Sequence, residues 1–332
     1  MSRPIPAILS VDVEPDGFQL STGSAATTGY DAAAEHFATL RDRLADATGR
    51  PVSFAWFFRM DPQIRQVYGR ADHLVSGYGD RVARLLDAGD KVGLHTHPIR
   101  WDDRSGLWTH EITDLDWLRE AYETSFAAFE QAFGAPCERH RTGGGIYDQF
   151  SVDTLERLGT KVESGLELRP GWRAGQDVNT GVDASPISAA SRDCLDAPRQ
   201  AYRPSAGDFM RAGDTGTMVM LPATTSRLQH GRPWWRTVGG TVKRRRLPQA
   251  QMLYPDSFNE PSAFWDLVTW QLRLMRRPYV NIAIRTDAPD SRQFRVASKV
   301  FAALADHPLA RRLEIVDPLV AAQRLLGEPA LI

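Results

Sequence analysis

The segment Ala7-Ile-Leu-Ser-Val11 is an apolar run that leads directly into the acidic stretch Asp12-Val-Glu14-Pro-Asp16. A short apolar run of this kind is typical of a strand that is buried on both faces, as in a parallel sheet. Alternate side chains of a strand point to the same face, so Asp12 and Glu14 are expected to face one site. Buried acids need partners. The pattern therefore indicates either a functional site at the strand end or a solvated strand end with acidic caps.

A second segment of this type, His95-Thr-His97-Pro98, follows the apolar run Lys91-Val-Gly-Leu94. Two histidines at positions i and i+2 of an extended segment share a face, and the chain has only eight histidines. Their spacing differs from that of a helical HExxH motif, which the sequence lacks. Carboxylate and imidazole are ligands of divalent metal ions. If the two strand ends converge, they predict a metal-dependent hydrolase.

Strand and helix patterns alternate along the chain. Apolar runs predict strands at 7–13, 52–58 and 92–94, and helical periodicity predicts helices at 31–47 and 114–133. Such alternation favours parallel strands with crossover helices, in a barrel or an open sheet. Because roughly seven or eight such units fill both halves of the chain, one barrel domain over residues 1–332 is the better prediction. Two stretches with little periodicity, near 167–214 and 229–259, are expected to be functional insertions.

The composition of the chain bears on nucleic-acid binding, disulfide formation and cellular location. A net charge of -1 over 332 residues gives no reason to expect nucleic-acid binding. The two cysteines, Cys137 and Cys194, lie outside any CxxC pattern, which fits a reducing compartment and leaves one disulfide open. No signal-peptide pattern and no stretch of membrane-spanning length is seen. The expected location is the cytoplasm, and peripheral contact with the inner membrane face is compatible with it.

Two further strand ends carry polar residues. Arg141 is followed by the glycine turn Gly143-Gly-Gly145, where backbone can approach a ligand closely, although a tight connection explains it equally well. Arg285 ends a late apolar strand, and in a parallel barrel it would lie on the same face as Asp12 and His95. The alternative for Arg285 is a surface ion pair with Asp287. No GxSxG nucleophile elbow occurs, which disfavours a serine hydrolase.

These segments, in this order, resemble the polysaccharide deacetylase family, also called the NodB-homology or carbohydrate esterase 4 family, in a divergent form. The resemblance extends from Ile8 to about Val316 and implies a distorted (β/α) barrel with about seven parallel strands. The first strand of that family ends in two acids, one of them the catalytic base and the other a metal ligand. The match makes Asp12 the base and Glu14 the ligand, although it also allows the two roles to be exchanged.

The resemblance implies a divalent metal site. His95 and His97 match the family's two metal-binding histidines, which are usually four residues apart, and Arg141 matches the arginine that positions the base. Zn²⁺ is the first choice of ion, with Co²⁺, Ni²⁺, Mn²⁺ and Fe²⁺ as alternatives. The late histidine that acts as general acid in the family is replaced by Arg285, a poor proton donor that would stabilise an oxyanion or an anionic substrate group. Leaving-group protonation would then fall to His97, His140 or water.

The implied reaction is hydrolysis of an N-acetyl or other N-acyl group on an amino sugar, an oligo- or polysaccharide or a glycan precursor. Aromatic and glycine-rich positions would contact the sugar, and nearby arginines the phosphate of a nucleotide- or lipid-linked sugar. The candidate substrate-binding residues are Asp16, Gly143, Tyr202, Trp234 and Trp235. The alternatives are an amidohydrolase that opens a small cyclic amide on the same barrel, and a non-catalytic carbohydrate-binding relative. An iron oxygenase is disfavoured because the acid is distant from the paired histidines.

Overall fold

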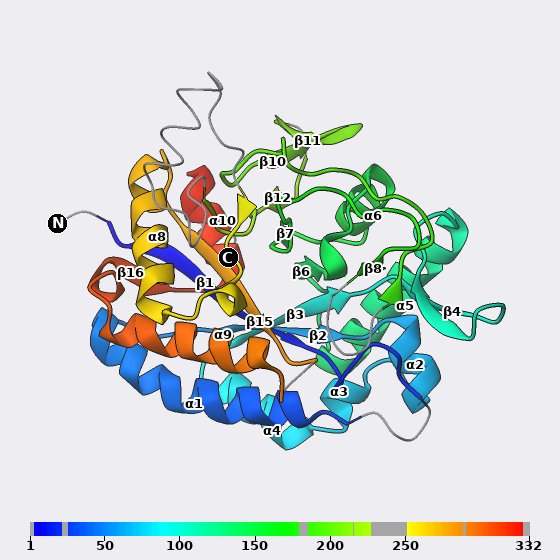
Figure 1. Cartoon of the computed structure of the whole chain (residues 1–332), viewed down its shortest axis with the longest axis horizontal. Helices are drawn as coiled ribbons and strands as arrows, with labels where there is room; N and C mark the ends of the chain where they lie inside the picture. Colours follow the sequence, from blue (N-terminus) through cyan, green and yellow to red (C-terminus); the bar gives the residue numbers. More distant parts are fainter. Residues whose placement is uncertain are drawn as a thin grey trace.

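A curled sheet of eight strands forms the centre of the molecule in the computed structural model (Figure 1), which describes residues 3–21, 26–178, 185–214, 216–226, 251–287 and 290–327. Seven strands follow one another in the order β12-β7-β6-β3-β2-β1-β15, β16 also pairs with β1, and every pairing is parallel. The predicted distorted (β/α) barrel with about seven parallel strands is therefore confirmed. The strands are β1 (Ile5–Val13), β2 (Ala55–Arg59), β3 (Lys91–Thr96), β6 (Arg139–Thr142), β7 (Val162–Glu163), β12 (Val219–Met220), β15 (Val280–Arg285) and β16 (Leu313–Ile315).

The two ends of the sheet meet through side chains in place of a strand ladder. Asn281 on β15 donates from Nδ2 to the carbonyl oxygens of Ser164 (2.9 Å) and Leu221 (2.7 Å). Thr224 closes the other side, because its backbone N–H donates to the Asn281 carbonyl and its Oγ1 accepts from the Asn281 N–H. A buried amide can satisfy backbone groups that no strand reaches. The barrel is distorted because this short seam takes the place of a full strand pair.

Helices cover the outside of the sheet, with α1 and α9 side by side along one flank (Figure 1). The predicted helix at 114–133 is α5, whose first turn is capped by Asp114, which accepts from the Trp117 N–H, and whose end is Gly134 in the left-handed conformation. Its buried side chains recur at helical spacing. The helices are α1 (Thr28–Thr48), α2 (Pro62–Tyr68), α3 (His73–Ser76), α4 (Gly79–Asp87), α5 (Leu115–Phe133), α6 (Gln149–Arg157), α8 (Pro261–Leu274), α9 (Arg292–Ala303) and α10 (Pro318–Leu326).

Short antiparallel pairs make up the less regular parts. The predicted insertion near 167–214 contains β8 (Asp177–Val178) with β9 (Ser185–Pro186), and β10 (Arg203–Ser205) with β11 (Asp208–Gly213). Most of the insertion near 229–259 lies outside the described residues; β14 (Gln251–Met252) pairs with β13 (Thr225–Ser226). A hairpin that the sequence did not predict, β4 (Ile99–Asp102) with β5 (Leu107–His110), projects from the barrel (Figure 1).

The structure also shows the state of the two cysteines and the character of the helices. Cys137 and Cys194 are both buried and free, so they form no disulfide. Within the described ranges, no helix combines the length and the apolar character that crossing a membrane requires.

A buried polar network lies on the helix-facing side of β6. His140 Nδ1 donates to Glu163 Oε2 over 2.5 Å, and Tyr147 donates its hydroxyl proton to Glu163 Oε1. The His140 ring stacks on Phe126 of α5. Because alternate residues of a strand face opposite ways, Arg141 then points to the barrel interior. His140 is therefore not available as the proton donor that the sequence suggested, since it packs in the core between sheet and helix.

Candidate metal centre and active site

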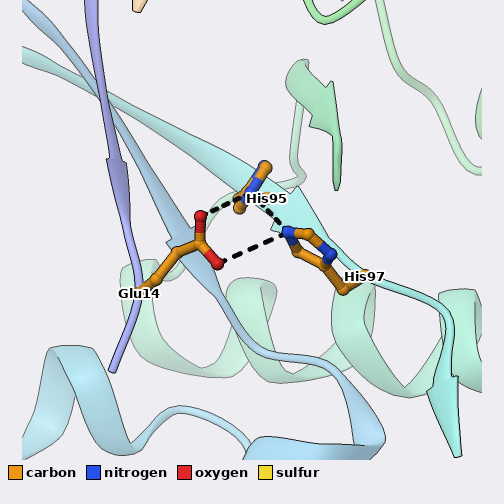
Figure 2. A group of neighbouring side chains, drawn as sticks. All are labelled: Glu14, His95 and His97. Atoms are coloured by element: carbon orange, nitrogen blue, oxygen red, sulfur yellow. Dashed lines mark hydrogen bonds and ion pairs between the residues drawn. The ribbon is translucent and has the colours of Figure 1, made fainter. Parts of the chain in front are cut away.

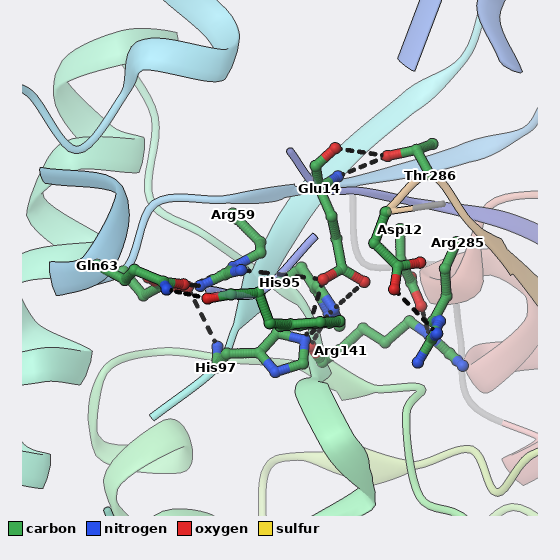
Figure 3. A network of polar contacts seen from close by, with 12 residues as sticks. Asp12, Glu14, Arg59, Gln63, His95, His97, Arg141, Arg285 and Thr286 are labelled. Atoms are coloured by element: carbon green, nitrogen blue, oxygen red, sulfur yellow. Dashed lines mark hydrogen bonds and ion pairs between the residues drawn. The ribbon is translucent and has the colours of Figure 1, made fainter. Parts of the chain in front are cut away.

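The acids at the end of β1 are fixed by the residue that follows β15. Thr286 donates its backbone N–H to the Asp12 carbonyl oxygen over 3.1 Å. Its Oγ1 accepts from the Glu14 N–H (2.7 Å) and donates to the Glu14 carbonyl (2.8 Å). The chain beyond β1 thus stays extended next to β15, in register with the pairing of Asp12 and Arg285. Asp12 and Glu14 consequently point into the same interior region (Figure 3).

Glu14, His95 and His97 converge at the carboxyl ends of β1 and β3 (Figure 2). His95 Nε2 lies 3.5 Å from Glu14 Oε1, His97 Nε2 lies 3.4 Å from Glu14 Oε2, and the two Nε2 atoms are 3.0 Å apart. All three side chains are buried. The Glu14 carboxylate oxygens form no hydrogen bond of ordinary geometry with the residues that the structure describes. Burying an ionised carboxylate without hydrogen bonds is costly, and a bound cation would offset that cost.

The dimensions of this group suit a small divalent ion. Zinc–nitrogen and zinc–oxygen bonds of about 2.0–2.2 Å put the corners of a tetrahedron about 3.3–3.6 Å apart. The observed separations between the donor atoms, 3.0–3.5 Å, match those edges closely. Two imidazoles and one carboxylate also form the three-ligand set of catalytic zinc sites, in which a fourth position stays open. The residues present therefore fit a divalent cation.

Burial and neighbouring charges set the protonation of the three donors. Burial, reinforced by the charges of His95 and Arg59, holds the pKa of His97 well below its ordinary value, so His97 is a neutral ligand. Burial alone would raise the pKa of Glu14, but His95, Arg285 and Arg59 hold it below its ordinary value. The carboxylates of Asp12 and Glu14 outweigh burial and raise the pKa of His95. A proton on His95 is thus the competitor that a metal ion must displace.

Second partners orient the two imidazoles. His95 Nδ1 lies 2.8 Å from the Arg141 carbonyl oxygen, which can only accept, so Nδ1 carries a proton and the neutral ring keeps its lone pair on Nε2. His97 packs against Gly143, where a Cβ atom would come within 2.3 Å of the His97 Nε2 and Cδ2 atoms. The Phe18 ring covers His97 from another side, with its centroid 5.2 Å away. Gly143, a predicted substrate-binding residue, is therefore in direct contact with a candidate ligand.

Sequence reasoning missed a buried cation next to this group. Arg59, at the end of β2, is fully buried and donates from Nε and Nη2 to both oxygens of Asp61 (2.7 and 2.9 Å). Its Nη2 also donates to Gln63 Oε1, and its Nη1 lies 3.9 Å from Glu14 Oε2. Figure 3 shows Arg59 and His97 close together on one side of the Glu14 carboxylate. The signal was present in the sequence, because Arg59 ends an apolar strand just as Asp12 does.

Asp12 and Arg141 form a second buried pair in the pocket. Arg141 donates from Nε to Asp12 Oδ2 over 2.9 Å, and its Nη1 donates to the Ser164 carbonyl over 2.6 Å. The other carboxylate oxygen, Asp12 Oδ1, is buried and forms no hydrogen bond within the described ranges. One oxygen of Asp12 is thus fixed by a cation and the other is left to accept a proton. The sequence placed these two residues together, and the structure brings them into contact.

Arg285 ends β15, where it is paired in register with Asp12, and Asp287 follows two residues later. Arg285 Nη2 lies 3.0 Å from Asp287 Oδ2, so the ion pair that was the alternative interpretation of Arg285 is present. The Arg285 side chain is 41% exposed, whereas that of Asp287 is only 8% exposed. Burial, opposed by Arg285 and supported by the Glu14 and Asp12 carboxylates, raises the pKa of Asp287 to about 6. Asp287 was not predicted as a site residue.

The other predicted substrate-binding residues lie elsewhere. Asp16 accepts from the Thr28 N–H, the Thr28 hydroxyl and the Gly29 N–H, so it caps the start of α1. Tyr202 is buried in the core, and its hydroxyl donates to the Phe209 carbonyl oxygen, which makes it structural. Trp234 and Trp235 lie outside the described residues.

Comparison with known proteins identifies similar solved structures. No family model matches the sequence, and a search of curated proteins returns no match. The chain is similar in structure to polysaccharide deacetylases. A putative polysaccharide deacetylase from Mycobacterium smegmatis is 11% identical with a TM-score of 0.46, covering 98% of this chain and 94% of its own. A carbohydrate esterase 4 family pseudoenzyme from Bacillus anthracis is 11% identical with a TM-score of 0.38, covering 92% of this chain and 66% of its own.

A further solved structure, named as Puue allantoinase, is 9% identical with a TM-score of 0.48, and the match covers 97% of this chain and 90% of that one. At such identities and TM-scores, these likenesses are too distant to transfer a function. The chemistry of the site has to be inferred from the residues of the chain itself.

Proposed function

We propose that this protein is a metal-dependent hydrolase that removes an N-acyl group from an amino sugar or glycan. The observation that carries the proposal is the buried Glu14–His95–His97 group, whose carboxylate forms no hydrogen bond within the described residues, next to the Asp12–Arg141 pair. Three ligands and an adjacent acid–arginine pair are the parts that metal-assisted amide hydrolysis requires. The sugar as substrate class comes from the sequence resemblance to polysaccharide deacetylases.

Glu14, His95 and His97 would hold the metal ion, and Zn²⁺ suits their oxygen and nitrogen donors best. When bound, a divalent ion polarises a carbonyl group and makes a water molecule more acidic. The protein supplies the rest. Burial of the three ligands excludes bulk water from the ion, and Arg141 fixes the ring of His95 through its carbonyl oxygen.

Asp12 would act as the general base. Among the described residues its Oδ1 has no hydrogen-bond partner, while Oδ2 is held by Arg141, which restricts rotation of the carboxylate. A base needs this kind of fixed geometry within hydrogen-bond reach of the proton it takes. Arg141 is a positioning residue in this scheme, because its contacts are to Asp12 and to the Ser164 carbonyl.

The amine leaving group needs a proton, and Asp287 would supply it. Arg285 is a poor donor because its guanidinium stays protonated. Asp287 is largely buried at the edge of the same pocket, close enough for the Glu14 and Asp12 carboxylates to influence its titration. A carboxyl with a raised pKa is a suitable acid near neutral pH. Arg285 would orient Asp287 and bind an anionic group of the substrate.

Asp287→Asn is expected to lower kcat on an N-acyl sugar by about 10²–10³-fold, because positioned acids contribute about that much. The wild-type rate should fall as the pH rises through about 6, where Asp287 loses its proton, and the variant should lack that fall. A pH profile of kcat measures both. As a control, an aryl ester of the same acyl group needs no proton on its leaving group, and the variant should hydrolyse it almost normally. An equal loss on both substrates contradicts this role.

The function as a whole is tested by metal content and a substrate panel. Purified protein should contain one divalent ion per chain, lose acetate release from N-acetyl sugars after chelation, and regain it with Zn²⁺. Glu14→Gln, which keeps the shape of the side chain but removes a charged ligand, should lose the ion. Ring opening of a cyclic amide without deacetylation would favour the amidohydrolase alternative. Sugar binding without metal or turnover would show that the protein is a binding relative and would overturn the proposal.

A further inference from the structure

The hairpin β4–β5 returns a third histidine to the candidate metal centre. Directly after His97, the Ile99 N–H donates to the His97 carbonyl, and the Glu111 N–H donates to the Pro98 carbonyl. Ile99 and His110 are paired across the two strands. His110, which is thirteen residues from His97 in the chain, is therefore placed next to it by the register of the hairpin.

The contact between the two rings is direct and buried. His110 Nε2 lies 3.1 Å from His97 Nδ1, with the ring planes inclined at 59°. The His110 side chain is fully buried, and the Phe18 ring packs against both imidazoles at 5.2 and 6.5 Å. Water has no access to the His97 Nδ1 atom on this side, so His110 is its hydrogen-bond partner. Sequence reasoning left His110 unassigned, although its ring is in direct contact with the ring of a candidate ligand.

The two nitrogens that face each other can share only one proton. If His97 binds an ion through Nε2, its remaining proton is on Nδ1, and His110 Nε2 must accept it. His110 then carries its own proton on Nδ1. Within the described residues, His110 Nδ1 forms no hydrogen bond of ordinary geometry. The opposite proton arrangement would put a proton on His97 Nε2, where it would block the ion.

His110 is not itself placed as a ligand. The donor atoms that lie within 4.8 Å of one another come from Glu14, His95 and His97, and His110 Nε2 points at the rear nitrogen of His97. The other histidine ligand has an equivalent support, because the Arg141 carbonyl accepts from His95 Nδ1. Each imidazole thus has one acceptor behind it, a backbone oxygen for His95 and a side-chain nitrogen for His97.

We propose that His110 is a positioning residue of the metal centre, which accepts the Nδ1 proton of His97 and so presents His97 Nε2 to the ion. The inference rests on the proposed metal-dependent function, but it concerns a residue that neither the sequence pattern nor the ligand group includes. Partners of this kind fix the tautomer and the orientation of a ligand, and their loss typically weakens metal affinity by about 10–100-fold.

The test is metal affinity measured by competition with a chelator, using Zn²⁺ and Co²⁺. His110→Ala should weaken binding by about 10–100-fold. His110→Gln should recover part of the loss, because its Oε1 can accept at a similar reach. His307→Ala is the matched control, since His307 is a partly buried histidine near Asp266 and outside the site, and its removal should leave affinity unchanged. The Co²⁺ absorption spectrum should change in His110→Ala and not in the control.

Thermal unfolding of the metal-free proteins separates positioning from folding. A structural role alone would lower the melting temperature of both His110 variants while their folded fractions bind metal normally, and that result would overturn the inference. Unchanged metal affinity and an unchanged Co²⁺ spectrum in His110→Ala would also overturn the inference. The proposed function would still stand in that case, because the wild-type protein would bind the metal. A wild-type protein that binds no divalent ion would reject both.

Discussion

Asp12→Asn is expected to lower kcat for deacetylation by about 10²–10⁴-fold, the usual contribution of a positioned general base. The substitution keeps the shape of the side chain, and its amide oxygen can still accept from Arg141 Nε over the observed 2.9 Å. What is lost is the ability of Oδ1 to take a proton from the attacking water. Single-turnover kinetics on an N-acetyl sugar would measure the loss, with metal content determined on the same sample.

Metal content decides between the two roles that the family resemblance allows for the acids of β1. If Asp12 is the base, Asp12→Asn keeps one ion per chain, whereas Glu14→Gln loses it. If the roles are exchanged, the variants show the opposite pattern. The geometry favours the first outcome, because Glu14 and not Asp12 lies within 3.5 Å of both imidazole Nε2 atoms. An Asp12→Asn protein with full activity would remove Asp12 from the mechanism altogether.

Gly143→Ala should abolish metal binding and turnover together. The added Cβ would lie 2.3 Å from both the Nε2 and Cδ2 atoms of His97, so the ring that supplies a ligand must move. Overpacking of this kind typically costs about 1–3 kcal/mol, and here the displaced atom is itself the metal donor. Titration with Zn²⁺ and a thermal melt would measure both effects.

Gly79→Ala is the matched control, since Gly79 begins α4 and a Cβ there meets nothing within 4 Å. Alanine is the better helix former, so this variant should retain wild-type metal affinity and equal or greater stability. Normal metal binding by Gly143→Ala would mean that His97 can tilt without loss, and that it is not held rigidly as a ligand.

Most residues of the candidate centre were predicted from the sequence by one rule, which assigns polar residues at the carboxyl ends of parallel strands to a common site. Asp12, Glu14, His95 and Arg285 each follow an apolar run, Arg141 precedes a glycine turn at another strand end, and parallel strands bring such ends to one face of a barrel. For Asp16 the same rule is ambiguous, because a carboxylate just beyond a strand can equally cap the helix that follows, as it does here for α1.

The roles of His110 and Tyr202 could not be predicted from the sequence. The role of His110 depends on the register of a hairpin, which short polar strands do not specify. Tyr202 combines an apolar ring with a hydroxyl, and sequence cannot distinguish a groove-lining tyrosine from a core tyrosine whose hydroxyl reaches a backbone carbonyl.

Three arginines, two of them buried, also determine the net charge of the site. Four acids and three arginines lie there, which leaves one net negative charge before any ion binds when Asp287 is ionised, and none when Asp287 carries the proton that it would donate. A divalent ion would therefore give the site a net positive charge in either protonation state of Asp287. An amide gains negative charge on its oxygen as water attacks, and a net positive surrounding stabilises that change. The charged residues are Asp12, Glu14, Asp61, Asp287, Arg59, Arg141 and Arg285.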